Sequence, residues 1–153
     1  MSSIADRLTE LGLVLPAVAK PLAAYVPAVI TGNLVYTAGQ LPFVDGVLPK
    51  TGKFGAELTV DDGAALAQQC ALNALAAVDS VIGSLDRVTR IIKVVAFIAS
   101  TPDFTAQPAV ANGASEILGK IFGDAGIHAR SAVGVSSLPI DSPIEVELIV
   151  EFA

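Results

Sequence analysis

The chain has 153 residues, of which 53% are hydrophobic and 16% charged, and its formal net charge is −6. This composition excludes a disordered chain, and the length predicts a single domain over residues 1–153. Nine basic against fifteen acidic residues argue against a surface that binds nucleic acid through positive charge. The mean hydropathy is high, at +0.67. Charges, glycines and prolines nevertheless interrupt each apolar stretch before about 18 residues, so no membrane span is expected. We expect a cytoplasmic protein that buries its surplus apolar surface in an oligomer.

The amino-terminal residues predict a short helix followed by irregular chain. Ser2 or Ser3 can cap the helix that begins at residue 3, Gly12 is its stop signal, and its apolar stripe consists of Ile4, Leu8 and Leu11. Three prolines between residues 16 and 27 predict extended, irregular chain after this helix. Asp6 and Arg7 lie where a signal peptide has its apolar core, so no secretion signal is expected.

A β-hairpin and a turn are predicted next. Two apolar segments, Val26–Ile30 and Leu34–Ala38, flank a Gly-Asn pair, which is typical of a tight hairpin. The Gly-rich residues 39–55 follow, with a turn predicted at Val44-Asp45-Gly46 and room for one further strand.

Two helices are predicted in the remainder of the chain. Thr59 and Asp62 have the spacing of a capping box and open a helix that runs to Ile82 and stops at Gly83. A second helix is predicted over 106–122, ending at Gly123. The apolar face of the first helix is rich in alanine, which predicts a close approach to a sheet; it comprises Ala64, Ala67, Cys70, Ala71, Ala74, Leu75, Val78 and Ile82.

Three further strands complete the prediction. Val88–Ala99 is apolar on nearly both faces, which predicts a central strand covered on both sides. Arg130–Ser136 is another strand, and Ile144–Phe152 alternates apolar with polar residues. The order ββ(β)αβαββ predicts an α+β fold in which one mixed sheet carries two helices on one face.

The chain lacks the residues that several kinds of chemistry require. With one cysteine, Cys70, the chain has no intramolecular disulfide and no cysteine-cluster metal site, and we interpret Cys70 as a core residue rather than a nucleophile. His128 is the single histidine, and G-x-S-x-G, G-x-G-x-x-G and Walker motifs are absent. We therefore expect neither a metal nor a cofactor.

Arg130 is the ligand-binding candidate that the residues themselves suggest. It opens a predicted strand beside small residues, and its planar guanidinium suits two-pronged binding of a carboxylate. The alternative is a surface ion pair with one of the surplus carboxylates. Glu145 and Glu147 share one face of the last strand, where solvated side chains are the simpler interpretation. A glutamate close to an anion-binding arginine could instead position water or exchange a proton.

Four short motifs follow one another in order along the chain. They are Thr37–Pro42, Lys93–Ile98, Ala129–Val133 with Leu138-Pro139, and Ile144–Glu147. Together they resemble the RidA family, also called the YjgF/UK or endoribonuclease L-PSP family, over residues 25–151. Residues 1–24 look like the amino-terminal extension of a longer subgroup. The resemblance implies a chorismate-mutase-like α+β fold and a homotrimer with ligand clefts between subunits.

The resemblance also implies a reaction and a set of site residues. The reaction is hydrolysis of enamines and imines such as 2-aminoacrylate to a 2-keto acid and ammonia, for which orientation and a placed water suffice. Arg130 matches the residue that binds the substrate carboxylate, and Glu145 matches the glutamate associated with the attacking water. The remaining substrate-binding positions are Tyr25, Gly39, Asn112 and Ala132.

Two positions depart from the family pattern and favour an alternative function. Ala132 stands where active deaminases often have cysteine, and Gly134 stands where glutamate is common, so the cleft is expected to be larger and less charged. This favours a non-catalytic trimer that binds a small carboxylate metabolite as a sensor. A ribonuclease, which the older family name suggests, is disfavoured by the acidic charge, the lack of a histidine pair and the scarcity of aromatic residues for base stacking.

Overall fold

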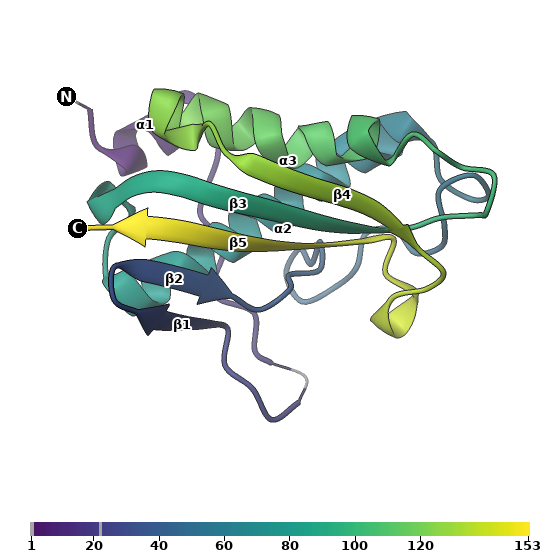
Figure 1. Ribbon diagram of the computed structural model, residues 1–153, viewed down its shortest axis with the longest axis horizontal. Helices are drawn as coiled ribbons and strands as arrows, with labels where there is room; N and C mark the ends of the chain where they lie inside the picture. Colours follow the sequence, from purple (N-terminus) through teal and green to yellow (C-terminus); the bar gives the residue numbers. More distant parts are fainter. Residues whose placement is uncertain (1, 22) are drawn as a thin grey trace.

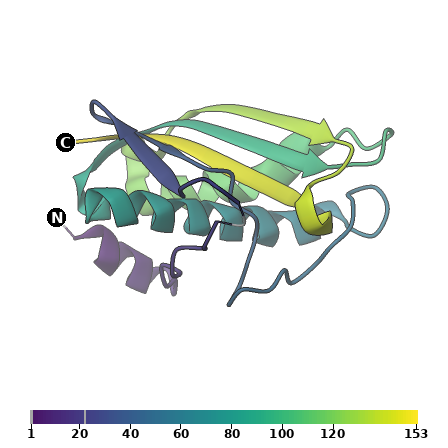
Figure 2. The ribbon, with the colours of Figure 1, turned by 90° about the horizontal axis from the view of Figure 1, so that it is seen from below.

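The computed structural model describes residues 2–21 and 23–153. In chain order the elements are α1 (Ile4–Glu10), β1 (Ala28–Thr31), β2 (Leu34–Thr37), α2 (Val60–Ile82), β3 (Val88–Ala99), α3 (Gln107–Phe122), β4 (Ala129–Val135) and β5 (Ile144–Phe152). The five strands form one mixed sheet (Figure 1), and α2 and α3 cover one of its faces (Figure 2). The predicted α+β class, with two helices on one face of the sheet, is confirmed.

The strand order in the sheet is β1-β2-β5-β3-β4. β3 and β4 are parallel, and the other neighbouring strands are antiparallel. β4 is therefore an edge strand, and β5 lies in the middle of the sheet. Because a parallel connection needs a crossover, α3 links β3 to β4 across the helix-covered face.

The predicted hairpin and turn both form. β1 and β2 are joined by Gly32 and Asn33, and Gly32 has a φ of 58°, which glycine adopts without a steric penalty. Val44 and Val47 exchange backbone hydrogen bonds of 2.9 and 3.0 Å across the second turn. The further strand considered within residues 39–55 is reduced to isolated bridges.

The helix boundaries agree closely with the predicted ones. α2 begins after the predicted capping box and ends at Gly83, which takes a φ of 84°. α3 begins one residue later than predicted, at Gln107, and ends before Gly123 as expected. The predicted strand at 130–136 lies one residue earlier, as β4.

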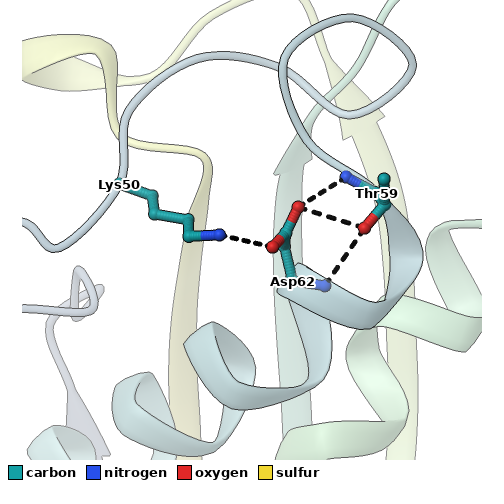
Figure 3. Close-up of polar contacts among 3 residues, drawn as sticks. All are labelled: Lys50, Thr59 and Asp62. Atoms are coloured by element: carbon teal, nitrogen blue, oxygen red, sulfur yellow. Dashed lines mark hydrogen bonds and ion pairs between the residues drawn. The ribbon is translucent and has the colours of Figure 1, made fainter.

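A lysine from the preceding loop extends the capping box of α2. The carboxylate of Asp62 accepts hydrogen bonds from the backbone N–H of Thr59 at 2.9 Å and from its hydroxyl at 3.0 Å (Figure 3). Nζ of Lys50 lies 2.5 Å from the other carboxylate oxygen. These bonds, led by that from Lys50, lower the pKa of Asp62 to about 2.

Stability is expected to depend on pH through Asp62. The pKa of this carboxyl is lower in the folded than in the unfolded chain, where it is 3.8. The carboxylate therefore stabilises the fold above about pH 4, and its contribution is lost as the pH falls through about 2. We expect the difference in urea midpoint between the wild type and Asp62→Asn to be constant above pH 4 and to shrink below it. Asp61→Asn, in the same helical turn but outside this cluster, is the control for the change in net charge.

The core lies between the helices and the covered face of the sheet. The inward residues of β5 (Ile144, Val146, Leu148 and Val150) are buried, as the alternation predicts. Cys70 is fully buried, and burial raises the pKa of its thiol well above the usual value, which supports its assignment as a core residue. α2 is long and apolar enough to cross a membrane, but 67% of its most apolar window is buried within the domain.

Close contact between α2 and α3 corrects one detail of the predicted helix face. Ala64 was expected on the buried face, but its side chain is exposed. Its backbone makes the contact instead: a Cβ at Gly113 of α3 would overlap the carbonyl oxygen of Ala64. The other seven residues of that predicted face are buried.

β3 was predicted to be covered on both faces, which is wrong for a single chain: only one of its faces is covered. Ile91, Val94, Ala96 and Ile98 are buried beneath the helices. Val95 and Phe97 point to the other face and are only half-buried, because none of the helices in the described part of the chain covers that side. We call this side the open sheet face.

Candidate functional site

Arg130 is held against α3 at the edge of the sheet. It pairs with Val94, a buried residue of the helix-covered face, so its side chain starts on that face. Nη1 donates to Oδ1 of Asn112 at 2.9 Å and to Oγ of Ser115 at 3.1 Å, and Nη2 lies 3.4 Å from the carbonyl oxygen of Pro108. The structure thus brings together Arg130 and Asn112, two of the predicted site residues.

Within the described residues, the charge of Arg130 is not neutralised by a carboxylate. The ion pair found among those residues joins Lys50 to Asp62 and does not involve Arg130. All three partners of the guanidinium are neutral oxygen atoms. The alternative of a surface ion pair is therefore not observed in the described chain, and the guanidinium keeps a full charge available to an anion.

Ser115 and His128 belong to the same cluster, and sequence reasoning did not assign them to a site. Oγ of Ser115 lies 2.9 Å from Nε2 of His128, and Nδ1 of His128 lies 2.6 Å from the carbonyl oxygen of Gly126. His128 precedes Arg130 by two residues, so both side chains project toward the same side of the chain. This two-residue spacing could have indicated that His128 lies near Arg130, but no pattern in α3 indicates Ser115.

The two residues that depart from the family pattern lie on the same face as Arg130. Ala132 is partly buried against the core, opposite Ala96. A Cβ at Gly134 would lie 2.7 Å from Nε2 of Gln107, an α3 residue whose amide donates to the carbonyl of Phe104 at 2.8 Å. The amide of Gln107 thus occupies the space beside Gly134, so the expected enlargement does not occur there.

Glu145 lies on the open sheet face, away from Arg130. Its neighbours in the strand, Ile144 and Val146, are buried beneath the helices, so its side chain points to the opposite side. Burial raises the pKa of the Glu145 carboxyl above its usual value, and the charge of Glu147 raises it further. A carboxyl of this kind takes up a proton more readily than a solvated one.

Gly39 packs on Glu145, and Tyr25 lies near Gly39. A Cβ at Gly39 would overlap the carboxylate of Glu145 and lie 2.6 Å from its Cδ, so the backbone of Gly39 packs directly on this side chain. Gly39 and Tyr25 both line a small cavity of about 40 Å³. Tyr25 is 49% exposed.

The predicted site residues therefore form two groups within one chain. Arg130, Asn112 and Ala132 lie on the helix-covered side at the edge strand, whereas Glu145 lies on the open sheet face with Gly39 packed on it, and Tyr25 shares a cavity with Gly39. The sheet separates the two groups, because alternate residues of a strand point to opposite faces. A site that uses both needs more than one chain.

Comparison with known proteins places this architecture in a family. Residues 5–152 match the family model described as "YjgF/chorismate_mutase-like, putative endoribonuclease". The chain belongs to the YjgF/RidA family. Protein TCP17 of Trypanosoma cruzi is 44% identical over 149 residues, which cover 97% of this chain and 93% of that protein.

Other relatives of this YjgF/RidA chain include a protein named for an enzymatic activity and proteins with solved structures. The 2-iminobutanoate/2-iminopropanoate deaminase of Escherichia coli K12 is 36% identical over 84% of this chain and 87% of that enzyme. The crystal structure of Atu1372, a protein of unknown function from Agrobacterium tumefaciens, is 42% identical, with a TM-score of 0.91 over 98% of this chain and 92% of that one. E. coli TdcF with bound serine is 26% identical, with a TM-score of 0.61 over 90% of this chain and 93% of that one.

Proposed function

We propose that this protein hydrolyses small 2-imino acids and their enamine tautomers to 2-keto acids and ammonia. The observation that carries the proposal is Arg130, a cation oriented only by neutral oxygens and therefore free to bind a carboxylate. Relatives named 2-iminobutanoate/2-iminopropanoate deaminase support the reaction class. The serine bound to TdcF is a small carboxylate ligand in a similar fold.

Arg130 would orient the substrate through its carboxylate. The Nη1 hydrogens are committed to Asn112 and Ser115 and one Nη2 hydrogen to Pro108, which leaves the Nε hydrogen and the other Nη2 hydrogen for a two-pronged hydrogen bond to the ligand. Binding in this orientation presents the imine carbon to a nearby group and removes the entropy cost of that alignment from the reaction step.

Glu145 would act on water at the imine carbon. As a base it removes a proton from the attacking water, and the C=N bond becomes a C–N bond in a carbinolamine. As an acid it gives this proton to the nitrogen, and it then moves the proton of the carbinolamine hydroxyl to the same nitrogen, so that the C–N bond breaks, ammonia leaves and the C=O bond of the keto acid forms. A carboxyl with a raised pKa suits both steps, because it takes up and releases a proton at little cost.

We also propose that the protein is a homotrimer and that its sites lie between subunits. Two observations support this: the two groups of site residues are on opposite sides of one sheet, and the open sheet face carries exposed apolar side chains beside Glu145 and Glu147. Val29 (52%), Tyr36 (40%) and Val133 (46%) are exposed there, and Val95, Phe97 and Ile149 are half-buried. Docking of this face on a second chain would bury it and bring Glu145 of one subunit toward Arg130 of another.

The direct test is to generate 2-iminobutanoate and 2-iminopropanoate with an amino-acid oxidase and to follow their loss. We expect faster loss with the protein than in buffer, and sedimentation of the active species as three chains. No acceleration with several imino acids would contradict the deaminase proposal, and full activity in a monomer would contradict the shared site.

A second candidate function is binding of a small carboxylate without turnover. The small residues at Ala132 and Gly134, with Gln107 beside the latter, favour it because they replace side chains common in active deaminases. Calorimetry with 2-oxobutanoate separates the two functions, since binding without any imine hydrolysis identifies the sensor.

Gly39→Ala is expected to lower activity more than stability. The added methyl group overlaps the Glu145 carboxylate, which is the flexible end of a side chain and can move aside at modest cost. The displaced carboxylate no longer positions the water, so kcat should fall by about tenfold or more. In Glu145→Gln the same glycine substitution should have little further effect on kcat, as a double-mutant cycle would show. Equal losses in both backgrounds would mean that Gly39 acts independently of Glu145.

A further inference from the structure

Arg130 is the first member of a hydrogen-bond chain that runs through Ser115 and His128 to the carbonyl oxygen of Gly126. The successive distances are 3.1 Å, 2.9 Å and 2.6 Å. The chain links the edge strand β4 to α3 and to the turn that precedes β4. It uses Nη1 of Arg130 and not the Nε and Nη2 edge that is proposed to bind the carboxylate.

The direction of donation in this chain follows from its two ends. A carbonyl oxygen can only accept, so Nδ1 of His128 carries the hydrogen that Gly126 receives. In the Nδ1–H tautomer of the ring, Nε2 is an acceptor. The hydroxyl of Ser115 donates to Nε2 and accepts from Nη1 of Arg130, which can only donate. Each group thus donates once to the next, and no donor faces a donor.

The far end of the chain is rigid. Gly126 is buried, and a Cβ at this position would overlap the carbonyl oxygen of Leu118 in α3 and lie 2.8 Å from its carbonyl carbon. The turn therefore lies directly on the α3 backbone, and the Gly126 carbonyl is a fixed anchor for the imidazole. The imidazole held by this anchor is linked through Ser115 to Nη1 of Arg130. This link opposes rotation of the guanidinium about the Nε–Cζ bond.

We propose that Ser115 and His128 are positioning residues that set the orientation of the Arg130 guanidinium and so its affinity for a ligand carboxylate. The ligand in this inference rests on the proposed function, whereas the ordering of Arg130 does not. Removal of either residue leaves the charge of Arg130 and its bonds to Asn112 and Pro108 in place but weakens the hold on Nη1. The expected loss is therefore smaller than the loss on removal of Arg130 itself.

The first measurement needs no ligand. His128 is the single histidine of the chain, so its ring nitrogens give one unambiguous set of NMR signals. We expect the Nδ1–H tautomer, and we expect the guanidinium of Arg130 to rotate slowly in the wild type and rapidly in Ser115→Ala and His128→Phe. Ser115→Thr, which keeps the hydroxyl, should restore slow rotation. An Nε2–H tautomer, or unchanged rotation in Ser115→Ala and His128→Phe, would overturn the proposal.

The second measurement is the Kd for 2-oxobutanoate by calorimetry. Ser115→Ala and His128→Phe should each weaken binding about tenfold, as expected for a lost charge-assisted hydrogen bond, while Ser115→Thr and His128→Gln should stay within about twofold of the wild type. Equal affinity in all variants would overturn the positioning role. If the wild type binds no 2-oxo acid, the proposed function fails, and the NMR experiment still decides whether the chain orders Arg130.

Discussion

Gly113→Ala is expected to lower the free energy of unfolding by about 2 kcal/mol or more. A Cβ at this position would overlap the carbonyl oxygen of Ala64 and lie 2.7 and 2.8 Å from its carbonyl carbon and Cα, all of them backbone atoms of α2. A backbone cannot rotate away as a side chain can, so α2 and α3 must move apart. The resulting loss of packing exceeds the gain of about 1 kcal/mol that alanine brings inside a helix.

Gly119→Ala is the matched control for this prediction. Gly119 lies in the same helix, and a Cβ there meets no atom within 4 Å. Only the helix propensity changes, so we expect stability to rise by roughly 0.5–1 kcal/mol. Urea unfolding of both variants measures the difference. A destabilisation of Gly119→Ala equal to that of Gly113→Ala would mean that the close approach of the two helices is not the cause.

Arg130→Ala is expected to lower kcat/KM for 2-iminobutanoate by about a hundredfold or more. The substitution removes the charge and both hydrogen bonds that the proposal gives to the substrate carboxylate, and charged hydrogen bonds of this kind contribute about 1.5–3 kcal/mol each. Stability should change little, because Arg130 makes no ion pair within the described residues and its partners lie at the protein surface.

Arg130→Lys separates charge from geometry in the same assay. Lysine keeps the positive charge but lacks the planar pair of donors, so activity should lie between those of the wild type and Arg130→Ala. Steady-state kinetics of the three proteins, with unfolding curves for each, provides the comparison. A rate in Arg130→Ala equal to that of the wild type would show that Arg130 does not bind the substrate carboxylate.

Local signals account for the parts of the fold that could be predicted. The capping box at Thr59 and Asp62, the stop at Gly83 and the alternation of β5 are properties of neighbouring residues, and each appears in the structure at the expected place. The cover of β3 could not be predicted in the same way. Its apolar residues show that both faces avoid water, but they do not say whether a helix or a second chain covers each face.

The candidate site could be predicted only in part for the same reason. The motif around Arg130 indicated this residue, and the last strand indicated Glu145, because both have recognisable local surroundings. The partner Ser115 was not predictable, since it is 15 residues away from Arg130 in sequence and meets it only when α3 packs beside β4.

Composition, periodicity and helix caps were enough to predict the α+β class, the helix and strand boundaries to within a few residues, and the residues available for chemistry. These signals act over a few neighbouring residues. The orientation of Arg130 by neutral oxygens and the position of Glu145 on the other side of the sheet became visible in the folded chain alone. Both depend on strand register and helix packing, which set which distant residues meet and which face of a sheet each side chain occupies.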